Sequence, residues 1–367
     1  MKPKEVINEP KLDTESLLKI IPTTRYQGSK RKILPWLYEN LRDLEFSTVL
    51  DGFGGTGIVS YLFKLMGKKV TFNDILFSNY QVGLALIEND SVKLSQSDLD
   101  FLLQENGFRY PSFIQDSFRN IYYLDEENKW LDMVSYNIEK LSEIYKGAVL
   151  KKKKALSYYV LFQACLCKRP FNLFHRNNLY IRTAKVYRSF GNKTTWERDF
   201  KSLFIRFNEE INNKIFSNKS RNRAICKDII EVKKNNYDLV YLDPPYARSD
   251  SRSPKNYFQL YHFLEGLVNY DDWKNMIDWN TPNRRLRKRE SKWDKNNTEY
   301  NLGILFKKFQ DSIIVISYGE PGYPSIQKII ELLKQYKSNI TTLKKSYNYR
   351  LNRNNGKNMN EVLIIGK

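Results

Sequence analysis

The chain has 367 residues, of which 41% are hydrophobic and 14% aromatic, and it carries a formal net charge of +20 with a pI near 9.5. This length exceeds the roughly 250–300 residues at which a single hydrophobic core stops growing, so we expect one main domain with a second lobe or a large insertion. The composition excludes a fibrous or disordered chain. The excess of positive charge favours a polyanionic partner, and nucleic acid is the usual one at such a pI.

The cysteine and histidine content bears on compartment and metal binding. The chain contains three cysteines, Cys165, Cys167 and Cys226. These are too few for a disulfide framework, so we expect a reducing cytoplasm. His175 and His262 have no zinc-like spacing to the cysteines, so we predict no metal site and interpret the cysteines at 165 and 167 as buried helix residues. Residues 1–24 lack an apolar signal core and are predicted to form a loose segment, with neither export nor membrane anchoring.

The first ordered pattern is "STVLDGFGGTG", residues 47–57. It predicts a strand through Leu50 and a glycine-rich turn, then a helix over residues 58–66 and a second strand that ends near Asp74. Strand, turn, helix and strand form a βαβ unit, the start of a doubly wound sheet. The glycines match G-x-G-x-x-G at Gly52, Gly54 and Gly57. An acidic residue about 20 positions later completes a pattern that suits any adenosine-bearing cofactor.

The middle of the chain changes from strand to helix periodicity. Apolar residues recur at helical spacing at Trp130, Met133, Val134, Ile138, Leu141 and Tyr145. We therefore predict a helical insertion over residues 77–219. Strand patterns resume with "NRAICKDII", "YDLVYLDPPY" and "DSIIVISY", and the last two, "ITTLKKSYNYR" and "NEVLIIG", predict a C-terminal antiparallel hairpin. A second, basic excursion is expected over residues 247–308, where "RRLRKR" at 284–289 is too polar for a core.

Residues 238–249 read "DLVYLDPPYARS". The apolar run at 239–242 predicts a short buried strand, and the two prolines must end it because neither can donate to a β-ladder. Asp243 therefore lies at the carboxyl end of a strand, the edge at which open α/β sheets bind ligands.

Three motifs together resemble one family. "DGFGGTG" resembles the D-x-F-x-G-x-G motif of S-adenosylmethionine-dependent amino-methyltransferases, and "DPPY" resembles their catalytic tetrad. Upstream, "RYQGSKRKILPWL" resembles the N-terminal motif of the Dam-like, D12-class DNA adenine N6-methyltransferases, and the order of all three motifs is that of the group. The resemblance covers residues 25–74 and 224–367, while the central insertion and the excursion after residue 247 match only loosely.

The resemblance implies that Asp243, Pro244, Pro245 and Tyr246 form the catalytic site. The exocyclic amine of adenine is a poor nucleophile because its lone pair is delocalised into the ring. If Asp243 and the Pro244 carbonyl accept its N–H bonds, the lone pair can point at the cofactor's methyl group. Tyr246 would stack on the base, which must first be flipped out of the duplex. A sulfonium leaving group requires neither a metal nor a protein nucleophile.

The resemblance also implies a set of residues that bind S-adenosylmethionine: Tyr26, Lys30, Asp51, Phe53, Gly54, Gly55, Gly57, Asp74 and Asp228. Phe53 is expected to pack on the cofactor's adenine, and Asp51 and Lys30 to lie near its methionine end. Asp74 is expected to accept hydrogen bonds from the ribose hydroxyls. Asp228 would meet the adenine amine, or would be a plain strand-end carboxylate. Tyr26 stands where the family commonly has Trp, which still permits stacking.

A basic and aromatic loop, "KRPFNLFHRNNLYIR" at residues 168–182, is a candidate DNA-reading segment, although a solvated loop is the alternative. The residues predicted to contact DNA are Lys168, Arg169, Asn172, His175, Arg176, Asn178, Arg284, Arg285 and Arg287. Of these, Asn172, His175, Arg176 and Asn178 are expected to determine which sites are methylated, and the three arginines of the second excursion to contact phosphates.

We therefore predict a Rossmann-like, doubly wound α/β fold with a mostly parallel sheet and a C-terminal antiparallel hairpin. Residues 25–76 and 220–367 would form the catalytic domain, with the excursion at 247–308 inside it, and residues 77–219 the recognition lobe. The expected activity is site-specific methylation of adenine N6 in double-stranded DNA. The enzyme would belong to a restriction-modification system, with a cognate restriction endonuclease as a possible partner, or would be an orphan or phage methylase.

Several alternatives stay open at this stage. An RNA adenine methyltransferase can share the tetrad, whereas a cytosine N4-methyltransferase more usually has Ser or Asn at the position of Asp243. A nicotinamide-dependent dehydrogenase would use the glycine turn but leave the tetrad and the charge unexplained. A non-catalytic DNA-binding protein would explain the charge but not the intact tetrad.

Overall fold

The computed structural model of the chain describes residues 14–26, 28–184, 193–245, 247–248, 256–287, 292–293, 297–347 and 359–367. Its centre is a seven-stranded sheet in the order β3-β2-β1-β4-β6-β9-β8. The strands are β1 (Thr48–Asp51), β2 (Lys69–Asp74), β3 (Arg223–Cys226), β4 (Leu239–Leu242), β6 (Ile313–Glu320), β8 (Ile340–Tyr347) and β9 (Met359–Gly366). All neighbours from β3 to β6 are parallel, while β9 is antiparallel to both β6 and β8. The predicted fold class, with its C-terminal hairpin, is confirmed.

The strand order reverses between β1 and β4. The chain runs outward from β1 to β2 and β3, then returns to pair β4 with the other side of β1, with Leu50 beside Val240. From β4 the chain continues outward on this second side of β1, where β6 pairs with β4. Loops that leave neighbouring strands in opposite directions open a crevice at their carboxyl ends, and this is where such sheets bind ligands.

Alternate residues of the central strands pack into two separate cores. Val49, Tyr241 and Val315 join one core, and their chain neighbours Leu50, Val240 and Ile314 join the other. This follows from the period of two along a strand, because successive side chains point to opposite faces. Both faces are buried, so these strands read as continuous apolar runs.

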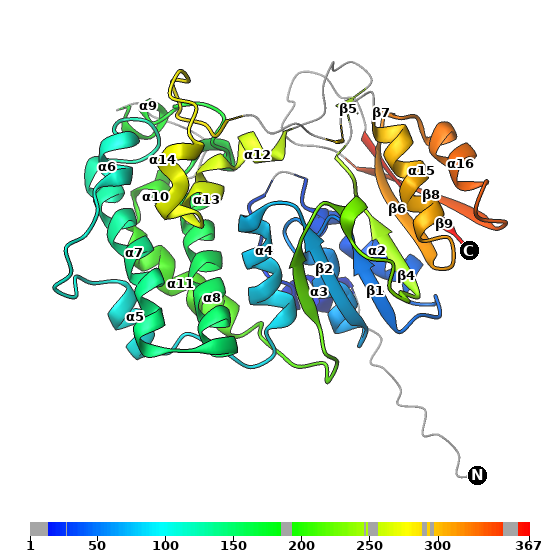
Figure 1. The fold of residues 1–367 in the computed structure, drawn as a ribbon, viewed down its shortest axis with the longest axis horizontal. Helices are drawn as coiled ribbons and strands as arrows, with labels where there is room; N and C mark the ends of the chain where they lie inside the picture. Colours follow the sequence, from blue (N-terminus) through cyan, green and yellow to red (C-terminus); the bar gives the residue numbers. More distant parts are fainter. Residues whose placement is uncertain are drawn as a thin grey trace, which may run out of the picture.

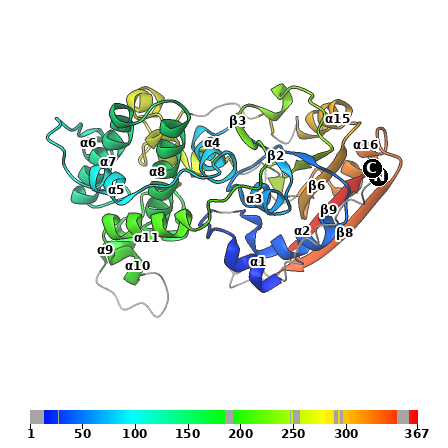
Figure 2. The same ribbon diagram turned by 90° about the horizontal axis from the view of Figure 1, so that it is seen from below.

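Helices cover both faces of the sheet, as Figure 2 shows. The first core includes residues of α1 (Thr14–Ile20), η1 (Lys30–Ile33), α2 (Leu34–Leu41) and α3 (Ile58–Leu65). The second core includes residues of η4 (Ile229–Glu231), α15 (Thr298–Lys308) and α16 (Ile326–Leu333). A short antiparallel pair, β5 (Ala247–Arg248) and β7 (Gly322–Tyr323), lies outside the main sheet.

The N-terminal segment differs from its prediction. Residues 1–13 lie outside the described residues, but α1 is ordered in the structure, and Leu17 and Ile21 are 0% and 1% exposed in the first core. Residues 14–24 are therefore packed rather than loose, because the helix places these apolar side chains against the layer that contains α2.

The central segment is helical, as predicted. It contains α4 (Phe77–Gly83), the π-helical turn η2 (Leu84–Glu88), α5 (Gln96–Leu102), α6 (Phe113–Ser117), α7 (Asp125–Ile144), α8 (Gly147–Cys167), η3 (Pro170–Asn172), α9 (Tyr180–Thr183), α10 (Lys193–Glu197) and α11 (Phe200–Asn212). Helix α8 is its centre, because every side chain from Ala155 to Cys167 is buried. Cys165 and Cys167 are thus buried helix residues, as expected. None of the helices in the described part of the chain has the apolar run of a membrane span.

The second excursion packs on the helices rather than on the sheet. It forms α12 (Tyr257–Leu260), α13 (His262–Leu267), η5 (Tyr270–Asp272) and α14 (Trp273–Met276), which lie on the side of α6 and α7 in Figure 1. The ring of Phe118 is 5.1 Å from that of Phe263 and 5.0 Å from that of Trp273. Sequence order had assigned this segment to the catalytic domain, but its apolar side chains find their partners in the helical lobe.

One acidic side chain also ties the excursion to the first turn of α4. Both oxygens of Glu265 accept backbone hydrogen bonds, from Phe77 N at 3.0 Å and from Ser78 N at 2.8 Å. Helix α4 itself packs on the sheet as well as on α8, since Gly83 lies so close to Phe72 that a Cβ there would be 2.3 Å from the ring. The boundary of the insertion at residue 77 therefore falls within the layer that covers the sheet.

Candidate active site

Asp243 lies directly after β4, at the carboxyl edge of the sheet. Every side chain of β4 is buried, and Pro244 is buried too, while Asp243 and Pro245 are half-buried. The strand ends where the prolines begin, as predicted from their missing backbone donors. Tyr246, the last residue of the predicted tetrad, lies outside the described residues.

Asp243 is joined to a buried ionic cluster. Lys30, at the start of η1, places Nζ 3.1 Å from Asp243 Oδ1 and 2.7 Å from Glu361 Oε1. Burial raises the pKa of the Asp243 carboxyl, Lys30 lowers it, and Glu361 raises it, and the balance lies above the ordinary value. Lys30 therefore contacts the predicted catalytic carboxylate directly. The sequence analysis did not find Glu361, although a single acidic residue inside the apolar run "NEVLIIG" is the signal that marks it.

Asp51 ends β1 beside this cluster. It is 1% exposed, and its Oδ2 accepts a hydrogen bond of 2.6 Å from the Ser60 hydroxyl of α3. Its Oδ1 is buried and meets no hydrogen-bond donor in the described part of the chain. Burial raises the pKa of this carboxyl to about 7, against the Ser60 hydrogen bond, and the charges of Asp243 and Asp74 add to the rise. The carboxylates at the ends of two neighbouring strands thus act on Asp51.

The glycine turn after β1 is shaped by packing and by left-handed backbone. A Cβ on Gly54 would lie 2.1 Å from the Phe72 ring, so this glycine allows close approach of strand β2 rather than of a ligand. Gly55 and Gly57 have φ values of +51° and +72°, which L side chains rarely adopt. The Asn73 amide donates to Gly52 O at 3.0 Å and to Lys227 O at 3.1 Å, which fixes the turn between β1 and β3. Asn73 was not predicted.

Asp74 ends β2 next to the glycine turn. Its carboxylate accepts three hydrogen bonds from the protein: from Gly55 N and Leu76 N, both at 2.8 Å, and from the Asn79 amide at 3.1 Å. Burial raises its pKa to about 6 against these three donors. A carboxylate has about four acceptor positions, so about one is left for a ligand. The expectation that Asp74 binds both ribose hydroxyls exceeds this remaining capacity.

Phe53 and Asp228 lie on the α15 side of the turn. The Phe53 ring is half-buried, with the Trp293 ring edge-on to it at 5.0 Å. Asp228 accepts a hydrogen bond from Ile230 N at 3.0 Å and forms an ion pair of 3.2 Å with Lys292. Its carboxylate therefore caps η4 and binds a lysine of the second excursion. Ile75, which directly follows Asp74 at the end of β2, is 55% exposed. It offers an apolar surface that the sequence analysis did not consider.

Tyr26 lies in a group of tyrosines rather than alone over a ligand. Its ring stacks on Tyr261 with centroids 3.8 Å apart and on Tyr257 at 5.9 Å. Both partners belong to the second excursion. Burial raises the pKa of Tyr26 well above its ordinary value, with Asn79 as its side-chain hydrogen-bond partner. The structure thus connects Tyr26 with Asp74 through Asn79, and with the helical lobe through Tyr261.

The predicted DNA-reading loop contains side chains that cannot reach DNA. Lys168 is 2% exposed and forms an ion pair of 2.7 Å with Glu127. Arg169 is 1% exposed, and it donates to the backbone carbonyls of Leu173 and Arg176 and to the side chain of Asn178. Burial lowers the pKa of Arg169 to about 10, yet it stays charged at neutral pH. Contact with DNA was predicted for Lys168, Arg169 and Asn178, but the structure buries all three against partners inside the protein, as a buried polar or charged group requires.

The outer residues of the same loop face solvent. His175 and Arg176 are exposed and Asn172 is half-buried. Phe171, which the sequence analysis did not assign, is 66% exposed and has a φ of +63°. A left-handed backbone conformation is unusual for a non-glycine residue, and here it carries an exposed aromatic ring.

A buried contact brings the two predicted DNA-binding regions together. Phe174 O accepts a hydrogen bond of 2.6 Å from the Tyr122 hydroxyl and one of 3.1 Å from the Asn283 amide. His262 Nε2 lies 2.8 Å from the same hydroxyl, and burial lowers the pKa of His262 to about 3, which keeps it neutral. Residues 168–178 and 281–287 are therefore neighbours, and we call them the paired loops. In Figure 1 the helices that adjoin them, α9 and α14, lie at the same end of the lobe.

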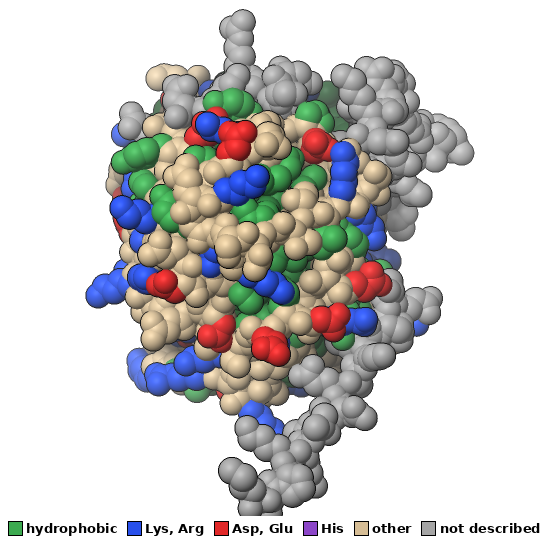
Figure 3. Space-filling model, turned by 90° about the vertical axis from the view of Figure 1, so that its right-hand side faces the viewer, with side chains coloured by type: hydrophobic (Ala, Val, Ile, Leu, Met, Phe, Trp, Pro, Cys, Tyr) green, Lys and Arg blue, Asp and Glu red, His purple; other side chains and the backbone are tan. Residues whose placement is uncertain are grey.

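Within the second of the paired loops the arginines differ. Arg285 and Arg287 are exposed, whereas Arg284 is half-buried and donates to Trp279 O at 2.7 Å, with its guanidinium 5.2 Å from the Trp279 ring. Leu286 between them is 1% exposed, so the basic run contains one core residue. At the opposite end of the molecule, Figure 3 shows a face on which basic and acidic side chains are interspersed. The net charge is not gathered on that face.

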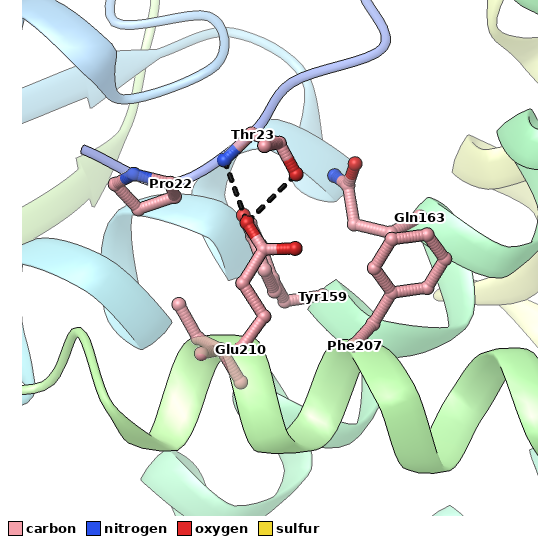
Figure 4. Close-up of a pocket in the computed structure, with 7 residues that line it drawn as sticks. Pro22, Thr23, Tyr159, Gln163, Phe207 and Glu210 are labelled. Carbon is pink, nitrogen blue, oxygen red and sulfur yellow. Dashed lines mark hydrogen bonds between the residues drawn. The ribbon is translucent and has the colours of Figure 1, made fainter. Parts of the chain in front are cut away.

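A shallow hollow, too small to hold a ligand, lies between the N-terminal segment and helices α8 and α11 (Figure 4). Thr23 donates from both its backbone nitrogen and its hydroxyl to Glu210, at 2.8 and 2.7 Å. Gln163 and Phe207 complete the wall with apolar neighbours. It contains no residue predicted for catalysis or cofactor binding, and we interpret it as a packing gap beside the hydrogen bonds that hold the N-terminal segment.

Comparison with known proteins relates this geometry to a family. The model of the D12 class N6 adenine-specific DNA methyltransferases matches residues 26–311, which include the glycine turn and Asp243. The chain is similar to the Type II methyltransferase M2.HphI of Haemophilus parahaemolyticus, with 26% identity over 353 residues that cover 94% of this chain and 97% of that protein. It is also similar to the Type II methyltransferase M.NlaIII of Neisseria lactamica, with 26% identity over 327 residues that cover 85% and 88% of the two chains.

Proposed function

Because the chain belongs to the D12 class of N6 adenine-specific DNA methyltransferases, we propose that it uses S-adenosylmethionine and that Asp243 directs the transfer. One observation carries the proposal. Asp243 follows β4 and the glycine turn follows β1, so the two meet at the point where the strand order reverses. A cofactor bound over the turn would therefore present its reactive end to Asp243.

The residues at the strand ends fit this cofactor. When bound, S-adenosylmethionine supplies an electrophilic methyl group on a sulfonium leaving group. The charges of Asp243 and Asp74 raise the pKa of Asp51, and Lys30 forms an ion pair with Asp243. This excess of negative charge suits the positively charged methionine end, and the free Oδ1 of Asp51 is an acceptor for its ammonium group.

The adenosine part would lie along the β2 side of the turn. We propose that Asp74 accepts a hydrogen bond from one ribose hydroxyl with its remaining acceptor position. Phe53 and the exposed side chain of Ile75 offer apolar surface to the adenine ring. Asp228 would reach the adenine amine only if its ion pair with Lys292 opened, so we place it in a supporting role.

The residues after β4 would activate the target amine. Asp243 and the carbonyl oxygen of Pro244 would accept hydrogen bonds from its two N–H groups. These hydrogen bonds draw the nitrogen toward tetrahedral geometry and make its lone pair available to attack the methyl group. After transfer the nitrogen carries a positive charge, and Asp243 is placed to take the proton it loses. Consecutive prolines hold the carbonyl in a fixed direction, so the geometry is set before the base arrives.

We propose that the recognition lobe comprises residues 77–219 together with residues 256–287. The support is the packing of Phe263 and Trp273 on Phe118 and the hydrogen bonds that join the paired loops. The exposed side chains of His175, Arg176, Arg285 and Arg287 and the half-buried side chain of Asn172 would then contact DNA. We also propose a cytoplasmic enzyme whose sites are shared with a cognate restriction endonuclease, because the two relatives are Type II methyltransferases.

Methylation assays test the function directly. Purified protein should transfer the methyl group of labelled S-adenosylmethionine to duplex DNA, and nuclease digestion should release N6-methyladenine. Sequencing of genomic DNA from a methylation-free host that expresses the protein should locate the sites. Structured RNA and DNA that lacks adenine serve as controls. Labelling of RNA in place of DNA, or N4-methylcytosine as the product, would contradict the proposal.

Base flipping gives an independent prediction. With 2-aminopurine at the target position, saturating protein should raise its fluorescence severalfold, because the base leaves the stack. Tyr246→Ala should reduce the rise, since the proposed stacking partner is lost. A probe with 2-aminopurine several base pairs away is the control. No rise at saturation would argue against extrusion of the target.

A further inference from the structure

A buried chain of polar side chains runs from strand β6, through β9, to Asp243, the proposed catalytic aspartate. The Ser317 hydroxyl of β6 donates to Glu361 Oε1 of β9 at 2.6 Å, and Lys30 Nζ donates to the same oxygen at 2.7 Å. Lys30 Nζ then lies 3.1 Å from Asp243 Oδ1. Ser317 and Glu361 are 0% and 1% exposed. Four separate elements, η1, β4, β6 and β9, thus meet in this one chain.

The charges along this chain do not balance. One ammonium group, Lys30, lies between two carboxylates, and a buried carboxylate such as Glu361 is costly without a cation beside it. Lys30 must therefore divide its attraction between Glu361 and Asp243. Without Glu361, the whole of that attraction would act on Asp243 and weaken it as a hydrogen-bond and proton acceptor.

We propose that Glu361 is a positioning residue for methyl transfer: it holds Lys30 beside Asp243 and takes up part of the lysine's charge, so that Asp243 remains a strong acceptor. The inference rests on the proposed function of Asp243. Because Lys30 engages Oδ1, Oδ2 is the oxygen that remains for the amine of the target base. Ser317 donates to the same carboxylate oxygen of Glu361 as the lysine and so helps to fix that carboxylate.

The acid–base behaviour of Asp243 supports this role. Burial raises the pKa of Asp243, Lys30 lowers it and Glu361 raises it. The other titratable groups that face Asp243 are Asp51 on β1 and Tyr241 on β4 itself. The charge of Asp243 raises the pKa of Asp51, and burial keeps the phenol of Tyr241 neutral. Loss of the Glu361 charge removes a contribution that raises the pKa, so the pKa of Asp243 should fall.

A carboxyl titration by NMR tests this without any need for activity. In full-length protein labelled with [13Cγ]aspartate, the Asp243 resonance is identified by its absence in Asp243→Asn. Its titration midpoint should fall by about one pH unit in Glu361→Gln. Ser317→Ala, which removes a hydrogen bond but no charge, should leave the midpoint within about 0.3 of the parent. An unmoved or raised midpoint in Glu361→Gln overturns the proposal, and so does an equal shift in Ser317→Ala.

Single-turnover rates across pH then test the consequence for transfer. Glu361→Gln should move the acid limb of the profile to lower pH and reduce the plateau by about tenfold, since a weaker base is less effective. Glu361→Asp keeps the negative charge but has a side chain one methylene shorter. The acid limb of its pH–rate profile should therefore match that of the parent, while its plateau rate falls. This variant also provides the test if Glu361→Gln does not fold. Parent-like plateaus in both variants overturn the role of Glu361. A parent without any methylation activity would instead overturn the proposed function, and the NMR midpoint would still decide the contact.

Discussion

At the sheet edge Lys30 is buried between two carboxylates, whereas in the paired loops Arg169 is buried among carbonyl oxygens. Both cations have lost most of their water and both are fully partnered. Their partners determine what each can do. Lys30 acts on the charge of Asp243 at the carboxyl edge of the sheet, while Arg169 acts on the shape of a loop.

The same difference separates the basic residues inside the paired loops. Arg169 holds the loop from within, and Arg176, whose backbone carbonyl it binds, turns its own side chain to solvent. A loop that reads DNA needs both kinds, because exposed side chains can contact a base reproducibly only when the backbone that carries them is fixed. Basic residues that look equivalent in the sequence therefore have opposite orientations.

Replacement of Asp243 should produce the largest effect and tests the sheet edge. Asp243→Asn should reduce the single-turnover rate by at least about 10³-fold while S-adenosylmethionine binds nearly as before, because the contact is needed chiefly in the transition state. Rapid-quench assays and calorimetry measure the two quantities. Asp311→Asn, at a carboxylate that is 70% exposed, is the matched control and should keep the parent rate. Near-parent turnover in Asp243→Asn would contradict the mechanism.

Replacement of Arg169 tests the other side of the comparison. Arg169→Met should lower the free energy of unfolding by about 2–4 kcal/mol, because it leaves buried acceptors at Leu173, Arg176 and Asn178 without a donor. Arg176→Met should change it by less than about 0.5 kcal/mol, as is usual for an exposed side chain. Urea unfolding followed by circular dichroism measures both. Equal losses would mean that the two arginines do not differ in the way their burial implies.

Asp74 should affect cofactor binding rather than the chemical step. Asp74→Ala should weaken the binding of S-adenosylmethionine by about 1–3 kcal/mol, because a charged acceptor is lost and the Gly55 end of the glycine turn is released. Asp228→Asn should weaken binding by less than tenfold, since that carboxylate is engaged by Ile230 and Lys292. Calorimetry distinguishes the two, and a thermal melt of each variant checks the fold. Unchanged affinity in Asp74→Ala would leave Asp74 with a structural role only.

The exposed residues of the paired loops should produce the smallest effects, and of two different kinds. The double change Arg285→Gln and Arg287→Gln should weaken binding to all DNA sequences and make the slope of log K against log salt less negative by about 1 for each side chain. Arg176→Gln should instead alter which sites are methylated. Anisotropy titrations in a salt series and methylation of a random-sequence library measure these. A change of site preference in the arginine pair, with none in Arg176→Gln, would reverse the assignment.

Much of the catalytic domain could be predicted because local rules decide it. The strand that ends at the prolines, the glycine turn and the βαβ unit each depend on residues close together in the chain. The period of two along the strands and the apolar runs also determined that both sheet faces are covered. Asp243 was therefore found at its correct place, at the end of β4, from the sequence alone.

The partners of these residues were decided only by the tertiary structure. Glu361 is more than 300 positions from Lys30 in the chain, and the two meet because β9 inserts beside β6. Residues 256–287 join the helical lobe for the same reason, since the apolar faces of α13 and α14 pack against Phe118. Burial of Lys168 and Arg169 depends on long-range packing, which residue type does not encode. A basic side chain can bind carboxylates, carbonyl oxygens or phosphates, so its type alone does not show which partner it has. The sequence by itself determined which chemical groups the protein carries and where its strands end, and the packing of distant segments decided which of those groups are buried, which are paired and which are exposed.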